Sequence, residues 1–391
     1  MQNFVFQNPT KIVFGRDTVR EIGKEAKPLG KKCLLLYGKG SIKKNGVYDT
    51  VVRSLHEEGI EFVECPGVKA NPVLTHTLEG VAAAKSEKVD FILAVGGGSV
   101  IDEAKAIALG AVVDYSPWEF YLGKRTPEKA LPIAAILTLA ATGSEMNGGT
   151  VITNEQTHDK FATSADILHP KVSILDPTTT FSVPADQTAY GSVDAIAHLL
   201  EGYLTTEDPH TPVQDRYAEG LITTLMETAP RLIANPADYE DRAAMMWAAT
   251  MAWNRLALSG LGDIRLPNHM IGHAFSALYD MAHGASLSLV IPSWMRYRIR
   301  GGYTRKIAQL AERVFGIHKN TEEQTALAGA DAYQAWARSI KSPTTLSEAG
   351  VPESDVDKIA QTAFRLATQW GMTNVYTLEV IREIVAGCGI E

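Results

Sequence analysis

The first half of the chain alternates between apolar, strand-like runs and helical patterns, and this alternation limits the folds that are open to it. The apolar runs lie at residues 31–38, 60–67, 90–98, 131–140 and 171–177. Near-continuous apolar strands of this kind are typical of parallel sheets that helices cover on both faces. We therefore predict an α/β domain with a parallel sheet, and a small hairpin formed by residues 150–154 and 160–163.

The character of the sequence changes near Pro184, after which helical patterns dominate and no convincing strand follows. The clearest helical stretches are residues 215–228, 238–257, 304–314, 322–339 and 353–367. We predict two domains, a Rossmann-like dinucleotide-binding α/β domain at residues 1–183 and an all-helical domain at residues 184–391.

Composition excludes several classes of partner. The net charge is −8 and no long Lys/Arg run occurs, which argues against nucleic acid binding. The longest apolar runs are too short to span a bilayer, and the N-terminus lacks the pattern of a signal peptide. We therefore expect no membrane association. Cys33, Cys65 and Cys388 show no CxxC spacing, so we expect reduced thiols and a cytoplasmic protein.

A glycine-rich stretch, AVGGGSVIDEAKAIA, follows one of the apolar runs and opens a helical pattern. Gly96, Gly97 and Gly98 would let backbone N–H groups approach a ligand closely. Ser99 suits a helix N-cap, with Asp102 three residues later as in a capping box. A helix N-terminus of this kind attracts phosphate, although the same pattern also fits an ordinary capped strand-to-helix turn.

A second glycine-rich turn follows the first clear strand of the sheet, and it consists of Gly38, Lys39, Gly40 and Ser41. No acid at this strand end would repel a 2′-phosphate, and Lys39, the following Lys43 and Lys44, and the Ser41 hydroxyl are present to hold one. The turn therefore favours NADP over NAD. The alternative is a solvated lysine turn without a ligand.

Polar side chains also gather at the end of a later strand, within LTLAATGSEMN. They are Thr138, Thr142, Ser144 and Asn147. Ligands of open α/β sheets bind beyond the carboxyl ends of the strands, so these side chains could hold a ribose or a carboxamide. They could equally form the turn and cap it.

A carboxylate and several histidines stand at helical spacing in the second half. Asp194 and His198 lie four residues apart in VDAIAHLLEGYL, and His269 and His273 repeat this spacing. His283 follows in an expected loop. One carboxylate with three imidazoles suits Zn²⁺ or Fe²⁺, while a buried His–Asp network remains the alternative. A Ser–His–Asp hydrolase is disfavoured because no GxSxG elbow is present. The other histidines are interpreted as surface or capping residues.

Taken in order, the motifs resemble those of one family along the whole chain. PTKIVFG, YGKGSIKKNGVYD, AVGGGSVID, ATGSEMN, SVDAIAH, HMIGH and AHG are together similar to the iron-containing (group III) alcohol dehydrogenases of the dehydroquinate synthase-like superfamily. The similarity is greatest to the NADP-dependent aldehyde reductase and butanol dehydrogenase branch. This resemblance implies four metal ligands, Asp194, His198, His269 and His283. It implies that His273 is an additional active-site histidine that does not bind the metal.

The resemblance also assigns cofactor-binding positions. The pyrophosphate loop of the family matches Gly97, Gly98 and Ser99, with Asp102 nearby, and the position that lines the adenosine matches Asn71. The turn that faces a 2′-phosphate matches Lys39 and Ser41. The positions near the nicotinamide and its ribose match Thr138, Thr142, Asn147 and Lys160. Two departures stand out. Ala282 replaces a common proline, which leaves ligation intact, and the turn reads GKGS where relatives often read GGGS, which adds a cation.

By the same resemblance, the expected enzyme transfers hydride between NADP(H) and a small primary alcohol or aldehyde, with one Fe²⁺ or Zn²⁺ held in a cleft between the domains. His273 would relay a proton or play a structural role. Members usually form dimers, often through N-terminal strands, and residues 1–15 are interpreted as two edge-strand segments. A polyol dehydrogenase, a dehydroquinate synthase-like lyase and a non-catalytic binding module remain the alternatives.

Overall fold

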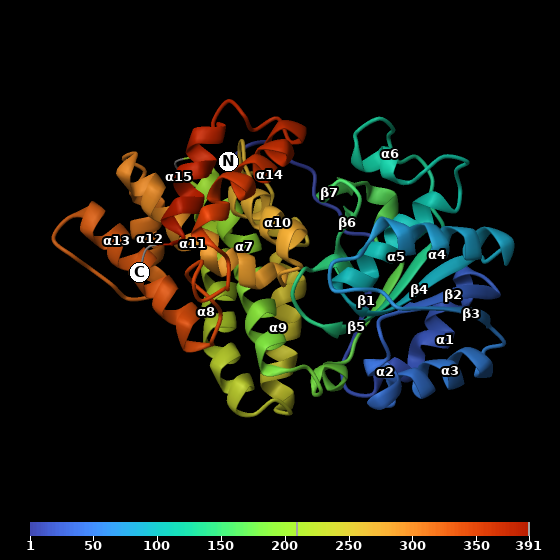
Figure 1. Ribbon diagram of the computed structural model, residues 1–391. Helices are drawn as coiled ribbons and strands as arrows, with labels where there is room; N and C mark the ends of the chain where they lie inside the picture. Colours follow the sequence, from blue (N-terminus) through green and yellow to red (C-terminus); the bar gives the residue numbers. More distant parts are fainter. Residues whose placement is uncertain (209, 390–391) are drawn as a thin grey trace. The chain divides into compact units, whose positions relative to one another are not determined.

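The computed structural model describes residues 1–208 and 210–389, which fold into two compact units (Figure 1). The α/β unit comprises residues 7–184 and 235–250, and the helical unit comprises residues 1–6, 185–234 and 251–391. This division differs from the predicted continuous domains in two segments, residues 1–6 and residues 235–250. The second belongs with the sheet because Trp247 packs edge-on against Phe14 at 5.9 Å and the Thr250 hydroxyl donates to Glu145 at 2.5 Å.

The α/β unit is built on a six-stranded parallel sheet with the order β1-β8-β5-β4-β2-β3. The strands are β1 (Lys11–Phe14), β2 (Lys32–Tyr37), β3 (Glu61–Pro66), β4 (Phe91–Gly97), β5 (Ile133–Leu139) and β8 (Val172–Leu175). A separate antiparallel hairpin pairs β6 (Gly149–Asn154) with β7 (Asp159–Ser164). The predicted parallel sheet and hairpin are both confirmed.

Helices cover both faces of the sheet, as Figure 1 shows for α1 and α3 on one face and α4 and α5 on the other. The helices of this unit are α1 (Ile22–Ala26), α2 (Ser41–Lys44), α3 (Val47–Glu57), α4 (Leu74–Ser86), α5 (Gly98–Gly110), α6 (Trp118–Tyr121) and most of α9 (Tyr239–Ala252). Leu34 and Leu35 face opposite sides of β2, yet both are fully buried. Burial on both faces explains why the strands read as continuous apolar runs rather than as alternating ones.

The N-terminal segment differs from expectation. Of residues 1–15, only Lys11–Phe14 forms a strand, at the edge of the sheet beside β8, and residues 1–10 have no regular structure. The side-chain amide of Asn8 donates a hydrogen bond to the carbonyl of Met146 at 2.8 Å. Pro9 has no N–H that could donate to a neighbouring strand. The prediction of a first edge strand before Pro9 is therefore wrong.

The helical unit contains no strand among its described residues, which confirms the all-helical prediction for them. Its helices are α7 (Ala185–Thr205), α8 (Pro212–Ala234), α10 (Pro267–Tyr279), α11 (His283–Arg300), α12 (Arg305–Val314), α13 (Glu322–Ser339), α14 (Val356–Gln369) and α15 (Leu378–Gly387). Helix α7 is buried continuously from Gly191 to Thr205 and packs against α8 and α11. A helix that is buried all round forms the centre of a bundle.

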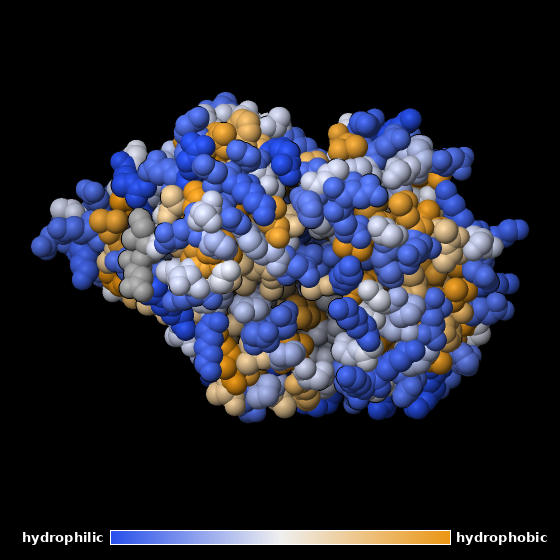
Figure 2. All heavy atoms as spheres, in the orientation of Figure 1, coloured by the Kyte–Doolittle hydropathy of each residue, from blue (hydrophilic) through white to orange (hydrophobic). Residues whose placement is uncertain are grey.

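The surface in Figure 2 is largely hydrophilic, with hydrophobic side chains in small groups. Within residues 1–208 and 210–389, no helix combines the length and the apolar character that a membrane span requires.

One histidine that was interpreted as a surface residue has a defined role in the α/β unit. His76 of α4 bonds through Nδ1 to the buried carboxylate of Glu103 on α5, and through Nε2 to the carbonyl of Pro66 at 3.0 Å. Since both ring nitrogens face acceptors, the imidazolium form satisfies both contacts. The Glu103 hydrogen bond raises the pKa of His76 to about 9.

We predict a pH-dependent contribution of His76 to stability. Because the folded pKa lies above the unfolded value of about 6.5, the contribution is complete below that value and is lost as the pH rises through about 9. His76→Gln should lower the free energy of unfolding by about 2 kcal/mol at pH 6 and by much less at pH 10. Urea unfolding at both pH values, with the exposed His318→Gln as control, checks this. A difference that does not change with pH would contradict it.

Candidate functional site

Helix α7 presents the first two predicted metal ligands from one buried face. Asp194 and His198 are 2% and 7% exposed, and their spacing places them one turn apart. The helix surrounds them with apolar side chains, so the carboxylate lies where water cannot compensate its charge.

Helices α10 and α11 supply the remaining imidazoles. His269 lies in the first turn of α10, and His283 is the first residue of α11. The expectation that His283 lies in a loop is wrong, because the helix starts at this residue. Gly284 makes the approach of α11 to α7 possible, since a Cβ atom there would lie 1.9 Å from the carbonyl oxygen of Tyr190.

The three imidazoles converge on one carboxylate oxygen. Oδ1 of Asp194 lies 3.8 Å from Nδ1 of His198, 3.9 Å from Nε2 of His269 and 3.7 Å from Nε2 of His283. These distances are too long for hydrogen bonds. They are close to the separation of about 3.4 Å between two ligand atoms that share a tetrahedral ion with bonds of about 2.1 Å. The ligand atoms of Asp194, His198 and His269 all lie within 4.8 Å of one another, so these three residues fit a bound divalent cation, and Nε2 of His283 lies beside the same carboxylate oxygen.

The electrostatics of the cluster agree with this fit. Burial and the neighbouring His269 hold the pKa of His198 well below its usual range, so its ring is neutral at neutral pH. A neutral imidazole has the lone pair that a metal needs. Three imidazoles and one carboxylate are a ligand set that suits Fe²⁺ or Zn²⁺.

Glu201 is a residue of this site that the sequence analysis missed. Its buried carboxylate accepts hydrogen bonds from the backbone N–H of His269 at 2.9 Å, from Nδ1 of His269 at 3.0 Å and from the Asn268 amide at 3.1 Å. Burial raises its pKa to about 8, against the lowering effect of those N–H groups. A signal was available, because Glu201 follows Asp194 and His198 on the same face of α7.

Two aromatic neighbours complete the surroundings of the cluster. Trp253, which the sequence analysis also missed, packs against the ring of His198 with centroids 4.8 Å apart. His273 lies beside the cluster, 5.0 Å from the ring of His283 and 5.9 Å from that of Trp370. This position is compatible with the predicted active-site role of His273, which stays a prediction.

The glycine-rich turns of the α/β unit lie where parallel sheets bind ligands. The chain passes from β2 outward to β3 and then returns to β4 on the other side of β2, so the order of the sheet reverses between β2 and β4. The turn Gly38–Ser41 follows β2, and Gly97–Ser99 follows β4. Ligands bind in the crevice outside the carboxyl ends of the strands at such a switch point.

Ser99 and Asp102 do not have the capping roles expected from the sequence. Gly97, not Ser99, is the N-cap of α5, and the Ser99 hydroxyl donates to the carbonyl of Ala70. Asp102 accepts from the Ser144 hydroxyl at 2.5 Å and from the Val151 N–H at 3.0 Å. The capping-box interpretation is wrong because both side chains reach neighbouring segments instead of the helix terminus.

The loop after β5 is brought against the glycine turn. A Cβ atom on Gly98 would lie 2.1 Å from Oγ1 of Thr142, so only glycine allows this contact. Asn147 uses its side chain inside the loop, donating to the Gly143 carbonyl at 2.8 Å and accepting from the Gly149 N–H at 2.8 Å. Its predicted cofactor contact stays a prediction, as does that of Thr138.

Two cofactor residues predicted from distant parts of the sequence contact each other. Nζ of Lys160 on β7 donates to Oδ1 of Asn71 at 2.9 Å, and both side chains are buried. The carbonyl of Ala70, the residue before Asn71, accepts a hydrogen bond from the Ser99 hydroxyl. The Asn71–Lys160 pair therefore lies close to the glycine turn that follows β4.

The turn after β2 has an acidic neighbour that the sequence interpretation overlooked. Glu64 of β3 forms an ion pair with Lys43 at 3.1 Å and accepts from the Tyr48 hydroxyl at 2.6 Å. Lys43 is thereby engaged, whereas Lys39 and Ser41 are exposed in the turn itself. Gly40 adopts φ 114°, a conformation that favours glycine.

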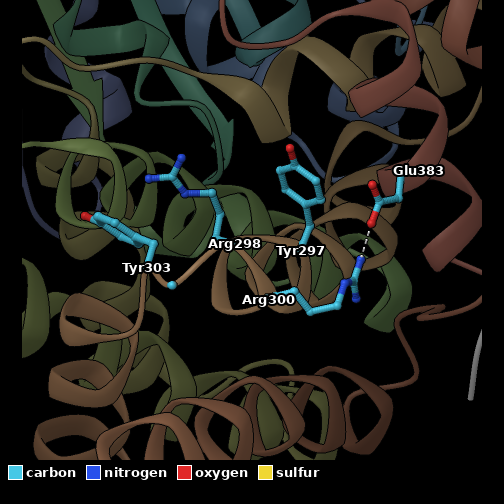
Figure 3. A pocket seen from close by; sticks show the side chains of 7 residues that line it. Tyr297, Arg298, Arg300, Tyr303 and Glu383 are labelled. Atoms are coloured by element: carbon cyan, nitrogen blue, oxygen red, sulfur yellow. Dashed lines mark hydrogen bonds and ion pairs between the residues drawn. The ribbon is translucent and has the colours of Figure 1, made fainter.

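A pocket at the end of α11 contains none of the predicted site residues (Figure 3). The guanidinium of Arg298 lies 4.2 Å over the ring of Tyr303, and Arg300 pairs with Glu383 at 2.7 Å. Both arginines lie in the last turn of the helix, where cations offset the helix dipole, so their presence has a structural explanation.

Comparisons with known proteins agree on one family. A model of iron-containing alcohol dehydrogenases matches residues 9–177, and a model of the C-terminal domain of Fe-containing alcohol dehydrogenases matches residues 188–386. A probable NADH-dependent butanol dehydrogenase of Bacillus subtilis is 43% identical, covering 94% of this chain and 95% of its own length. The NADPH-dependent aldehyde reductase YqhD of Escherichia coli is 35% identical, covering 98% and 99%.

A solved structure supports the same assignment. The crystal structure of an NADH-dependent butanol dehydrogenase from Thermotoga maritima superposes with a TM-score of 0.95 at 46% identity, and the match covers 100% of this chain and 99% of that one.

Proposed function

The chain belongs to the iron-containing alcohol dehydrogenase family, and we propose that it catalyses hydride transfer between a nicotinamide dinucleotide and a small primary alcohol or aldehyde, such as butanol and butanal. The observation that carries this proposal is the convergence of Asp194, His198, His269 and His283. It occurs in a chain that relatives named butanol dehydrogenase match over nearly its full length.

In this proposal each residue has a defined task. When bound, the divalent cation supplies Lewis-acid polarisation of an alcohol or carbonyl oxygen. Asp194 contributes the one negative charge among the ligands, so the loaded site keeps a net positive charge. His273, beside His283, takes up or releases the hydroxyl proton. The glycine turns after β2 and β4 hold the dinucleotide, whose nicotinamide carries out the hydride chemistry.

Steady-state kinetics test the proposal. The protein, stripped of metal and reloaded with Fe²⁺ or Zn²⁺, should oxidise NADPH or NADH when butanal is added. Glycerol and dihydroxyacetone serve as comparison substrates for the polyol dehydrogenase alternative. Absence of butanal-dependent oxidation with either metal and either cofactor would reject the proposal.

The finer choice of cofactor is also a proposal: we infer that the turn Gly38–Ser41 accepts NADP(H). Lys39 and Ser41 are exposed there and offer a cation and a hydroxyl to a 2′-phosphate. Glu64 weakens this preference by engaging Lys43. The butanol dehydrogenases of Bacillus subtilis and Thermotoga maritima are named for NADH and the aldehyde reductase YqhD for NADPH, so both cofactors occur within the family.

Lys39→Ala tests this inference. We expect kcat/KM for NADPH to fall about fivefold, since an exposed lysine–phosphate contact contributes about 1 kcal/mol, while the value for NADH changes less than about twofold. Lys24→Ala, which changes an exposed lysine of α1 in the same unit, serves as the control. Equal losses with both cofactors in the Lys39 variant would show that Lys39 does not read the 2′-phosphate.

We further propose a cytoplasmic homodimer. The edge position of β1 in the sheet supports association through that edge. Cys33, Cys65 and Cys388 are free thiols, which agrees with a reducing compartment. Light scattering on the purified protein measures the assembly.

A further inference from the structure

Glu201 contacts a metal-binding histidine without reaching the metal position itself. Both hydrogen bonds to His269, one from the ring and one from the backbone, end on Oε1, and Asn268 donates to Oε2. The carboxylate thus meets three N–H donors from two consecutive residues at the start of α10. It lies one turn beyond His198 on α7, in a position with no exposure to solvent.

These contacts determine which ring nitrogen of His269 faces the predicted metal position. With Nδ1 carrying the hydrogen that Glu201 accepts, Nε2 has the lone pair and faces Oδ1 of Asp194 at 3.9 Å. Rotation of the ring about its Cβ–Cγ bond would break the Nδ1 contact and turn Nε2 away from the cluster. The second hydrogen bond, from the backbone N–H, fixes the position of the main chain that carries the ring.

We propose that Glu201 is a positioning residue that holds His269 as a metal ligand and raises its affinity for the cation. The proposal rests on the proposed function. A carboxylate that accepts the second N–H of a ligating imidazole fixes the ring and makes it a better donor. The three N–H donors that meet the Glu201 carboxyl group hold the start of α10 and the ring of His269 in one arrangement.

Glu201→Gln keeps the shape of the side chain and replaces one carboxyl oxygen with an amide nitrogen. Gln keeps one oxygen for the two His269 donors, and Asn268 can present its own carbonyl oxygen to the new amide by turning its side chain. We therefore expect the variant to fold. Outer partners of metal ligands typically contribute 10–100-fold in affinity, so we expect the Kd for metal to rise about tenfold in Glu201→Gln and about 100-fold in Glu201→Ala.

The measurement is a titration of Co²⁺ into the metal-stripped full chain, followed by its visible absorption and by competition with a chelator. A changed Co²⁺ spectrum in Glu201→Gln would report altered geometry at the cation, which a purely structural role would not produce. Glu219→Gln is the matched control. Glu219 is another buried carboxylate of the same unit, on α8, that bonds to Tyr203 and Arg313 instead of a histidine.

The outcomes separate this inference from the proposed function. A rise in the Kd of the Glu201 variants, with Glu219→Gln unchanged, supports the inference. Wild-type affinity and spectrum in a folded Glu201→Gln would overturn it, whatever the behaviour of Glu201→Ala. If the wild type itself bound no Co²⁺ and reduced no butanal, the proposed function would fail instead.

Discussion

Asp194→Asn is expected to abolish tight metal binding and to lower kcat/KM for butanal by at least about 10³-fold. The carboxylate oxygen lies within 3.9 Å of three imidazole nitrogens and supplies the only negative charge among the four ligand side chains. A neutral amide oxygen is a weaker ligand. The Lewis-acid contribution at stake is several kcal/mol, and about 4 kcal/mol corresponds to a 10³-fold change in rate.

The same substitution should leave the metal-free fold intact. In the absence of a cation, Asp194 is a 2% exposed carboxylate in an apolar helix, and a buried charge of this kind costs stability. We therefore expect metal-free Asp194→Asn to melt at the same temperature as metal-free wild type or higher. Metal analysis, kinetics and thermal denaturation measure the three quantities. Asp186→Asn, an exposed residue in the first turn of the same helix, is the control. Retention of stoichiometric metal and full turnover would show that Asp194 is not a ligand.

How far the sequence predicts this site depends on the range of the interactions involved. Asp194 and His198 could be paired from helical spacing alone, because one helix determines both positions. Their convergence with His269 and His283 depends on how α10 and α11 pack against α7, and spacing along the chain does not contain that information. The resemblance to a known family supplied it. The start of α11 at His283 was missed because Ala282, the residue at the N-cap, has no side chain that could accept a capping hydrogen bond, so the sequence carries no capping signal there.

The nucleotide side shows the same limit. The strands, the order of strand and helix and both glycine turns follow from local pattern. The partners of Asp102, namely Ser144 and Val151, come from residues more than 40 positions away, so a local capping rule gave the wrong role. Glu64 likewise reaches Lys43 across neighbouring strands and helices. The long-range contacts of buried polar groups are therefore the part that pattern alone could not provide.

A buried ion pair that includes none of the predicted ligands should have the largest effect on the stability of the helical unit. Nζ of Lys306 on α12 lies 2.6 and 2.7 Å from the two carboxylate oxygens of Asp215 on α8 and 3.0 Å from the hydroxyl of Thr211. Gln309 donates to the same carboxylate at 2.9 Å. Lys306 and Asp215 are both almost fully buried, so neither charge can be solvated by water if the other is removed.

Lys306→Met is accordingly expected to lower the free energy of unfolding by about 3–5 kcal/mol, because it leaves the Asp215 carboxylate buried without its cation. The double variant Lys306→Met with Asp215→Asn should regain a large part of that loss, since no buried charge remains. The exposed pair Arg300–Glu383 has a similar separation of 2.7 Å, yet Glu383→Gln should cost less than about 1 kcal/mol. Urea denaturation followed by far-UV circular dichroism compares the four proteins. If Lys306→Met were no more destabilising than Glu383→Gln, or if the double variant were as unstable as the single one, the buried charge would not be the cause.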